Sequence, residues 1–195
     1  MRKFIFIICI LMCTNFSFAQ EIGKFRAVTI LDFAKTQLAD FEIIKTAEKG
    51  LNVDIPRFSN FNNKKIEVTL KAKKSHSNKN SYNKTVYTRI KMEQFEFETK
   101  EICKQAMDSL LNCFPYDCFK IERYVNQGVK MTPSVWIFNE QRIIIAQTAC
   151  EQVDEKWTKF KKKFVNTFAN SDTEIIVTEC GYLTWKTKEE ILNEK

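Results

Sequence analysis

The first twenty residues, MRKFIFIICILMCTNFSFAQ, have the pattern of a secretory signal peptide, and this feature sets the chemical conditions under which the rest of the chain folds. Two basic residues precede an unbroken apolar run over residues 4–13, and Ser17 and Ala19 are the small residues that signal peptidase requires. We predict cleavage after Ala19. The mature protein is then secreted or periplasmic, where cysteines can form disulfide bonds.

The same segment argues against a membrane-spanning protein. Its apolar run is about half of the ~20 residues that a transmembrane helix needs, and no later segment is long and apolar enough to span a bilayer. A lipid anchor on Cys13 would need a small residue before it, whereas Met12 precedes it. We therefore expect residues 1–19 to be removed and residues 20–195 to form a single α+β domain.

The charge balance of the chain is basic, which fits either a solvated lysine-rich surface or an acidic partner. There are 31 Lys and Arg residues against 24 Asp and Glu, and loss of Arg2 and Lys3 with the signal leaves 29, a formal net charge of +5. An exported protein seldom meets nucleic acid, so the partner would be an unidentified protein or an acidic polymer, unless the lysines only improve solubility. Residues 73–84 have almost no apolar side chain and are predicted to form a mobile hairpin loop. The candidate contacts with an anionic partner are Lys73, Lys74, Lys79 and Lys84.

The first half of the chain predicts one helix and two strands before a second helix. Only four glycines and three prolines are present, which favours a few long elements. Apolar residues at near-helical spacing predict a helix over residues 28–49. Alternating apolar and charged residues predict strands over residues 65–73 and 85–98, with a bulge, or a bend into a separate strand, where the alternation shifts before Phe95. Thr99 is a candidate N-cap for a helix that ends near Cys113.

The second half predicts a hairpin, a helix and another hairpin. Residues 134–138 and 142–148 form the first hairpin, and residues 174–180 and 182–186 form the second, before a terminal helix. The helix over residues 151–169 is amphipathic. Its inward residues are Val153, Trp157, Phe160, Phe164 and Phe168, and its outward lysines are Lys159, Lys161, Lys162 and Lys163. The fold class is therefore α+β, an antiparallel sheet with helices packed on one face.

Several kinds of chemistry are excluded by what the chain lacks. His76 is the only histidine, and it lies in the polar loop, where no packed scaffold positions it. This excludes a Ser-His or Cys-His pair and a histidine-built zinc site, and four scattered glycines cannot form a phosphate-binding loop. We predict no catalytic, cofactor-binding or metal-binding residue. Glu151, Asp154 and Glu155 leave a carboxylate-based hydrolase open, although acidic residues at a helix start commonly only complement the helix dipole.

Five cysteines remain after signal cleavage, namely Cys103, Cys113, Cys118, Cys150 and Cys180. The odd number means that at least one is unpaired or pairs between chains. Cys103 and Cys113 are ten residues apart on one predicted helix, about 15 Å, and cannot bond to each other. Cys113 and Cys118 flank a turn-like spacer and form the preferred bridge. Cys150 and Cys180 could pair with each other, or either one with Cys103.

The segment Met131-Thr-Pro-Ser-Val-Trp-Ile-Phe138 resembles the loop that carries the cis-proline of thioredoxin-like folds, and a cysteine pair lies upstream of it. The resemblance implies thiol-disulfide exchange, with Pro133 beside the reactive cysteines. The pair Cys113 and Cys118 differs from that family in its spacing, which is not C-x-x-C, and in following a helix rather than preceding one.

These observations favour a secreted or periplasmic, non-enzymatic binding or interaction module. An inhibitor of a secreted enzyme, or an immunity-type protein against one, belongs to this class. The prediction depends on the lack of a catalytic constellation. Two alternatives remain open, a thiol-disulfide oxidoreductase of thioredoxin-like type and a carboxylate-based hydrolase.

Overall fold

The computed structural model describes residues 27–50, 58, 61, 63–77, 85–114 and 118–194. The predicted signal peptide with its cleavage site lies outside these residues, as do Lys79 and Lys84. Within the described part of the chain, no helix has both the length and the apolar character needed to cross a membrane.

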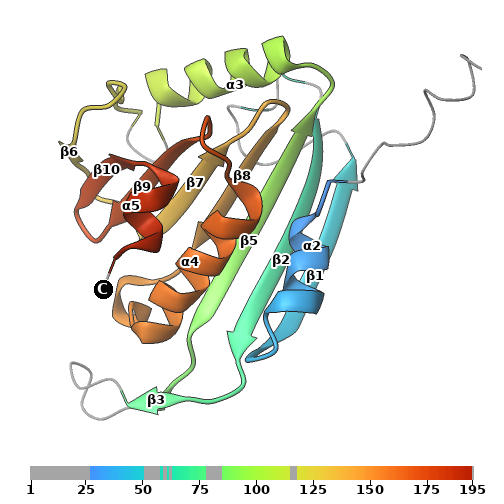
Figure 1. Cartoon of the computed structure of the whole chain (residues 1–195), viewed down its shortest axis with the longest axis vertical. Coiled ribbons are helices and arrows are strands. Elements are labelled where there is room, and N and C mark those ends of the chain that lie inside the picture. The colour runs from blue at the N-terminus through green and yellow to red at the C-terminus, as the bar shows by residue number, and fades with distance from the viewer. Residues whose placement is uncertain are drawn as a thin grey trace, which may run out of the picture.

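Eight strands form one sheet in the order β1-β2-β5-β8-β7-β9-β10-β6 (Figure 1), and every pair is antiparallel. The strands are β1 (Phe41–Gly50), β2 (Asn63–Ala72), β5 (Arg89–Phe97), β6 (Gln127–Gly128), β7 (Ser134–Phe138), β8 (Arg142–Gln147), β9 (Glu174–Glu179) and β10 (Tyr182–Lys186). The short strands β3 (His76–Ser77) and β4 (Thr85–Val86) pair with each other in the connection between β2 and β5. The prediction of an antiparallel sheet in an α+β protein is confirmed.

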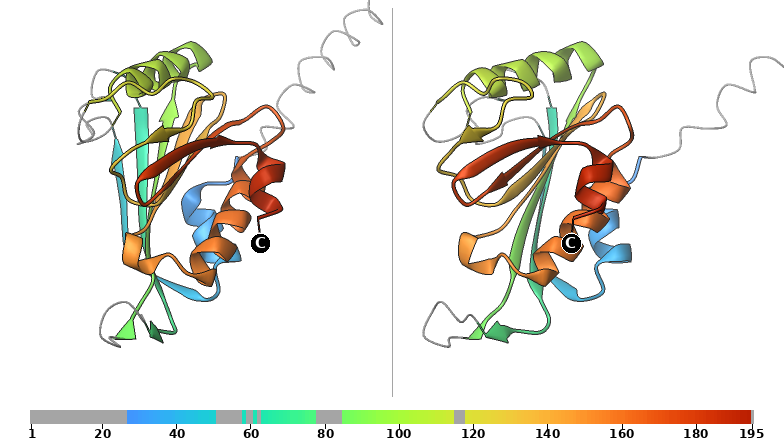
Figure 2. Two further views of the ribbon diagram at one scale, coloured as in Figure 1. Left: turned by 90° about the vertical axis from the view of Figure 1, so that its left-hand side faces the viewer. Right: turned by 60° about the vertical axis from the view of Figure 1, so that its left-hand side comes forward.

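The helices lie on both faces of this sheet (Figure 2). One face packs against α2 (Ile30–Gln37), α4 (Glu155–Phe168), which follows the short helix η1 (Cys150–Gln152), and α5 (Lys188–Leu192). The other face packs against α3 (Lys100–Asn112). The predicted packing of helices on one face is therefore not confirmed.

The central strands explain why both faces need a cover. All five residues of β7 are buried, with Val135 and Ile137 in the cluster under α4 and Trp136 and Phe138 in the cluster under α3. Because successive strand residues point to opposite faces, a continuous apolar run leaves two apolar faces. A run of this kind favours a sheet with helices on both sides.

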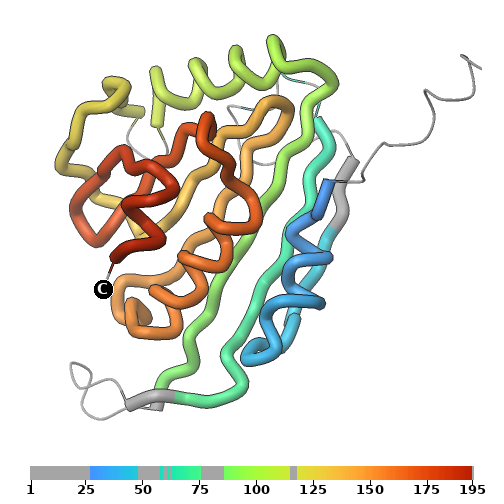
Figure 3. The backbone as a smooth tube through the Cα atoms, in the orientation of Figure 1, coloured from blue at the N-terminus to red at the C-terminus, as the bar shows by residue number. Residues whose placement is uncertain are grey.

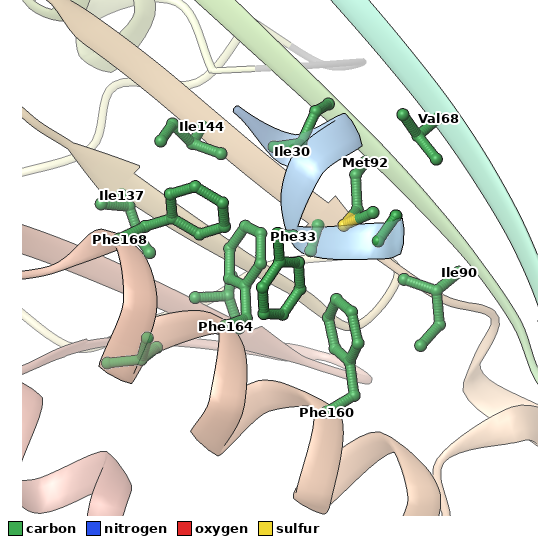
Figure 4. Packing of buried hydrophobic residues seen from close by; sticks show 14 of the residues in the cluster. Ile30, Phe33, Val68, Ile90, Met92, Ile137, Ile144, Phe160, Phe164 and Phe168 are labelled. Atoms are coloured by element: carbon green, nitrogen blue, oxygen red, sulfur yellow. The ribbon is translucent and has the colours of Figure 1, made fainter. Parts of the chain in front are cut away.

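Aromatic rings fill the space between α2 and α4, which lie side by side over the sheet (Figure 3). The ring of Phe33 on α2 lies 6.1, 5.9 and 5.2 Å from the rings of Phe160, Phe164 and Phe168, in edge-to-face geometry. Figure 4 shows Phe33 directed toward these α4 side chains. Edge-to-face contacts add to the stabilisation from apolar burial, so Phe33 helps to fix α2 onto the core together with the buried Ile30 and Ala34.

The predicted helix over residues 28–49 is wrong in its second half. Thr29 begins α2 with a capping box to Asp32, but the helix ends at Gln37 and residues 41–50 form β1, an edge strand paired along β2. Leu38 and Phe41 both face the core from the turn between helix and strand. Their spacing continues the helical pattern although the chain has changed direction.

The predicted bulge before Phe95 is also absent, since β2 and β5 pair without a register shift. Ile90 and Met92 face the cluster under α4, whereas Phe95 and Phe97 face the cluster under α3. The apolar pattern shifts because the apolar side chains of β5 lie on the α4 side of the sheet in the first half of the strand and on the α3 side in the second half. The bulge of this sheet lies in β1 instead, between Ile43 and Lys45.

Candidate functional site

The most distinctive surface feature is a groove of about 520 Å³ between α4 and two other segments. One segment is the turn from α2 to β1, which contributes Leu38, Asp40 and Phe41. The other is the short stretch after β2, which contributes Lys73 and Lys74. A volume of this size is typical of sites for small ligands.

Local hydrogen bonds hold the two non-helical segments together. The backbone N–H of Phe41 donates to the carbonyl of Leu38 over 3.0 Å, which closes the turn after α2. The N–H of Lys73 donates to the carbonyl of Asp40 over 2.9 Å, which places the chain after β2 against that turn. These two hydrogen bonds fix the backbone of the two non-helical segments of the groove.

The floor of the groove is apolar. Leu38 and Phe160 are almost fully buried and belong to the core under α4, and Phe41 packs against that core while remaining partly exposed. The rings of Phe41 and Phe160 lie 6.4 Å apart in edge-to-face geometry. A ligand in the groove would therefore contact the outer surface of the hydrophobic core.

The rim of the groove is strongly basic. Two carboxylates, Asp40 and Glu155, face six lysines, namely Lys73, Lys74, Lys156, Lys159, Lys162 and Lys163. Three of these ammonium groups donate to backbone carbonyls: Lys156 to that of Lys74, Lys163 to that of Gln37 over 3.3 Å, and Lys162 to that of Glu194. A carbonyl does not neutralise an ammonium group, so the rim keeps its positive charge.

One ion pair crosses the exposed edge of the groove. Lys159 Nζ lies 2.6 Å from a carboxylate oxygen of Glu155, one helical turn earlier on α4. The hydrogen bond and charge of Glu155 raise the pKa of Lys159, and those of Lys159 lower the pKa of Glu155. Both side chains are more than two thirds exposed, so solvent and salt screen this pair and an incoming anion can compete for Lys159.

Only part of this groove follows from the sequence prediction. Lys73 and Lys74 were predicted as anionic-partner contacts and lie on the rim, whereas Lys79 and Lys84 lie outside the described residues. The sequence did not predict that four lysines of α4 lie on the same rim as Lys73 and Lys74. A lysine run on an amphipathic helix has the pattern of a solvated face, and nothing local in the sequence indicates which segment lies opposite it.

Lys161 differs from its neighbours on α4 and from its predicted exposed position. Only 6% of its side chain is accessible, because its ammonium group lies 2.5 Å from Glu194, which also binds Lys186 at 2.5 Å. Burial alone would raise the pKa of Glu194, but Lys161 and Lys186 outweigh it and the pKa is lowered. A second cavity, of about 610 Å³, is lined in part by Lys161, Lys186 and Glu194. These three charged groups already pair with one another.

The structure brings four of the five predicted cysteines together in pairs. Cys113 and Cys118 form one disulfide, with Cα atoms 4.1 Å apart, and Cys150 and Cys180 form another, with Cα atoms 5.8 Å apart. Cys103 is the unpaired residue; it is buried, and its Sγ lies 3.6 Å from the carbonyl of Asn139. Burial raises the pKa of the Cys103 thiol to about 12, so it is not a nucleophile at neutral pH.

The structure gives little support to the thioredoxin-like interpretation. All peptide bonds of the described residues are trans, including the one before Pro133. Cys113 lies at the C-terminal cap of α3, where the helix dipole does not favour a thiolate. Pro133 instead lies in the second cavity with Cys180, a residue of the other disulfide.

The predicted carboxylates at the start of α4 make helix-capping and ion-pair contacts. Asp154 is the N-cap: one carboxylate oxygen accepts from the N–H of Trp157 over 2.9 Å and the other from the hydroxyl of Thr88 over 3.1 Å. Glu155 pairs with Lys159, and Glu151 lies in η1. Among the described residues, no three His, Cys, Asp or Glu side chains gather as a metal site would require.

A second carboxylate pair lies in the sheet, on the face opposite α4. Glu67 of β2 and Glu93 of β5 are directly opposite each other, and Lys65 and Lys91 contact both. Burial would raise the pKa of Glu67, but Lys91, Lys65 and Lys45 outweigh it and lower the pKa. A carboxylate that stays ionised cannot donate a proton, so Glu67 is better suited to ion pairs with the lysines of its own and neighbouring strands than to proton transfer.

No known protein family, curated protein or solved structure matches this chain.

Proposed function

We propose that this protein is an exported, non-enzymatic binding module that holds a negatively charged partner in the groove beside α4. The observation that carries the proposal is the convergence of lysines from two distant segments, residues 73–74 and α4, around one apolar floor. Six lysines against two carboxylates give this small region an excess of positive charge. Such a region attracts anions and speeds their association.

The ionisation of the groove supports binding rather than catalysis. The pKa of Glu155 is lowered and that of Lys159 is raised, so both side chains stay charged at neutral pH. A general acid or base needs the opposite arrangement, a pKa moved toward the working pH. An inhibitor or immunity-type protein, which recognises an acidic segment of an enzyme, belongs to the same class of binding module.

Charge reversal at three rim lysines tests the proposal. The variant Lys73→Glu, Lys74→Glu and Lys159→Glu changes residues whose ammonium groups make no contact with a backbone carbonyl among the described residues. A matched control changes three exposed lysines outside the groove, Lys104, Lys120 and Lys130, to Glu. Both variants have the same net charge.

Binding of two anionic probes, poly-L-glutamate and decanoate, is then measured by isothermal titration calorimetry at low and high salt. We expect at least one probe to bind wild type and the control, to lose at least tenfold in affinity in the groove variant, and to bind less tightly as salt rises. Equal losses in the two variants, or no binding of either probe to wild type, would contradict the proposal.

A further inference from the structure

We infer that the ligand of the groove is a small amphipathic anion, with one hydrocarbon chain and a carboxylate or phosphate head. This inference depends on the proposed function, because it names the chemical class of the anionic partner. It follows from the arrangement of the groove in two layers, an apolar floor below a basic rim.

The floor indicates a hydrocarbon chain. Leu38, Phe41 and Phe160 form a recessed surface that continues the core, and the contact between Phe41 and Phe160 gives it a defined shape. An acidic polymer binds through exposed cations and gains nothing from an apolar floor below them. A hydrocarbon chain gains free energy for every methylene that it removes from water.

The lysines serve two purposes in this arrangement. Lys156 is held by the carbonyl of Lys74 and Lys163 by the carbonyl of Gln37, so their stems connect α4 to the two opposite segments. Lysine stems are apolar and extend the hydrophobic lining toward the rim. Lys73, Lys74 and Lys159 are then the residues that can move to donate charge-assisted hydrogen bonds to the head of the ligand.

The concave shape favours a single amphiphile over a membrane surface. A bilayer presents its charges in a plane and would meet the lysine heads, while the floor between Leu38 and Phe160 lies below them and is almost fully buried. One chain that enters the groove reaches this floor and leaves its head at the rim. The shared chemistry is that of a fatty acid or of a single-chain phosphate ester.

A chain-length series with the wild-type protein tests the inference. Octanoate, decanoate and dodecanoate are titrated below their critical micelle concentrations, and decyl phosphate is titrated beside decanoate to distinguish the two kinds of head. A fully buried methylene changes affinity about fourfold, so we expect affinity to rise by up to about 15-fold for each added pair of methylenes. Acetate and inorganic phosphate, which have no chain, should bind at least 100-fold more weakly than decanoate.

Two variants separate the contributions of head and chain. The groove variant Lys73→Glu, Lys74→Glu and Lys159→Glu should weaken decanoate binding at least tenfold and keep the dependence on chain length. Phe41→Ala, which is at a partly exposed position, should reduce that dependence, whereas Val125→Ala, at a valine that is 42% exposed elsewhere, should not. If Phe41→Ala fails to fold, the wild-type series still decides the question.

Three results would overturn the inference. Binding of poly-L-glutamate through the rim lysines without chain-length dependence among the carboxylates would reject it and leave the proposed function intact. Binding to phosphatidylglycerol vesicles but not to monomeric amphiphiles would also reject it, in favour of a membrane surface. Absence of binding to every probe would reject both the inference and the proposed function.

Discussion

The two disulfides should stabilise the protein to different extents, and the difference can be calculated from the chain that each one closes. Cys113 and Cys118 are five residues apart in sequence, and Cys150 and Cys180 are thirty apart. The loop-entropy relation assigns about 2 kcal/mol to the short loop and about 3.5 kcal/mol to the long one. Replacing both members of a pair by Ala should therefore cost about 1.5 kcal/mol more at Cys150 and Cys180.

Equilibrium urea denaturation of the two double variants, followed by circular dichroism, measures this difference. We expect the urea midpoint to be highest for wild type, lower for the variant without Cys113–Cys118 and lowest for the variant without Cys150–Cys180. Cys103→Ala is the control, because this residue is unpaired and its replacement affects only local packing. Equal losses in the two double variants, or the reverse order, would refute the reasoning from loop length.

Three further predictions concern the core and the sheet. Phe33→Ala should cost about 3–5 kcal/mol in unfolding free energy by urea denaturation, because it removes the ring that connects α2 to three rings of α4. The control Val28→Ala, at an exposed position, should stay within about 0.5 kcal/mol of wild type. A small effect at Phe33 would show that α2 is held by other contacts. Lys65→Met should cost about 1–3 kcal/mol in the same assay, because the buried Glu93 loses its closest partner, at 2.6 Å, and keeps only Lys91, at 3.2 Å. The double variant with Glu93→Leu should recover most of the loss. No recovery would show that Lys65 stabilises the fold by more than its pairing with Glu93. Because the pKa of Glu67 is lowered in the fold, its ionised carboxylate stabilises the protein above the ordinary carboxyl pKa, and this contribution is lost as pH falls through the lowered value. Glu67→Gln should therefore lower the thermal unfolding midpoint more at pH 6 than at pH 3. A larger effect at pH 3 would contradict this direction of the pKa shift.

The starts of α3 and α5 and the hairpin of β7 and β8 were predictable because their signals are local. Thr99 caps α3, Asp154 caps α4 and Thr187 caps α5, and each hydroxyl or carboxylate accepts a backbone N–H of the first helical turn. The hairpin of β7 and β8 was visible as two apolar runs around a polar turn. Where a side chain and its partner lie within a few residues, the sequence alone is sufficient.

The errors occurred where partners are distant in sequence. Phe41 and Ile43 belong to β1 because they pair with Ala72 and Leu70 of β2, and this pairing overrides the helical spacing of the preceding residues. Lys161 is buried because Glu194 reaches it from beyond α5 and holds its ammonium group at 2.5 Å. Both cases need the tertiary structure, which local periodicity does not contain.

The candidate site shows the same limit. The lysines at 73 and 74 were recognised by composition, but the groove also needs α4, whose Lys156 reaches the carbonyl of Lys74 across 82 positions of sequence. Its floor depends on Phe41, a residue that the sequence pattern assigned to a helix. A groove formed by three segments has no signature in any one of them.

The central claim is that the groove binds a small amphipathic anion, and its most direct test is a two-dimensional ¹H–¹⁵N NMR titration of the protein without residues 1–19 with decanoate. The groove account predicts saturable shift changes concentrated at the backbone amides of residues 38–41, of Lys73 and Lys74, and of the α4 residues from Glu155 to Lys163. Changes centred on α3 or on β6, which lie away from the groove, or the absence of any saturable change, would contradict it.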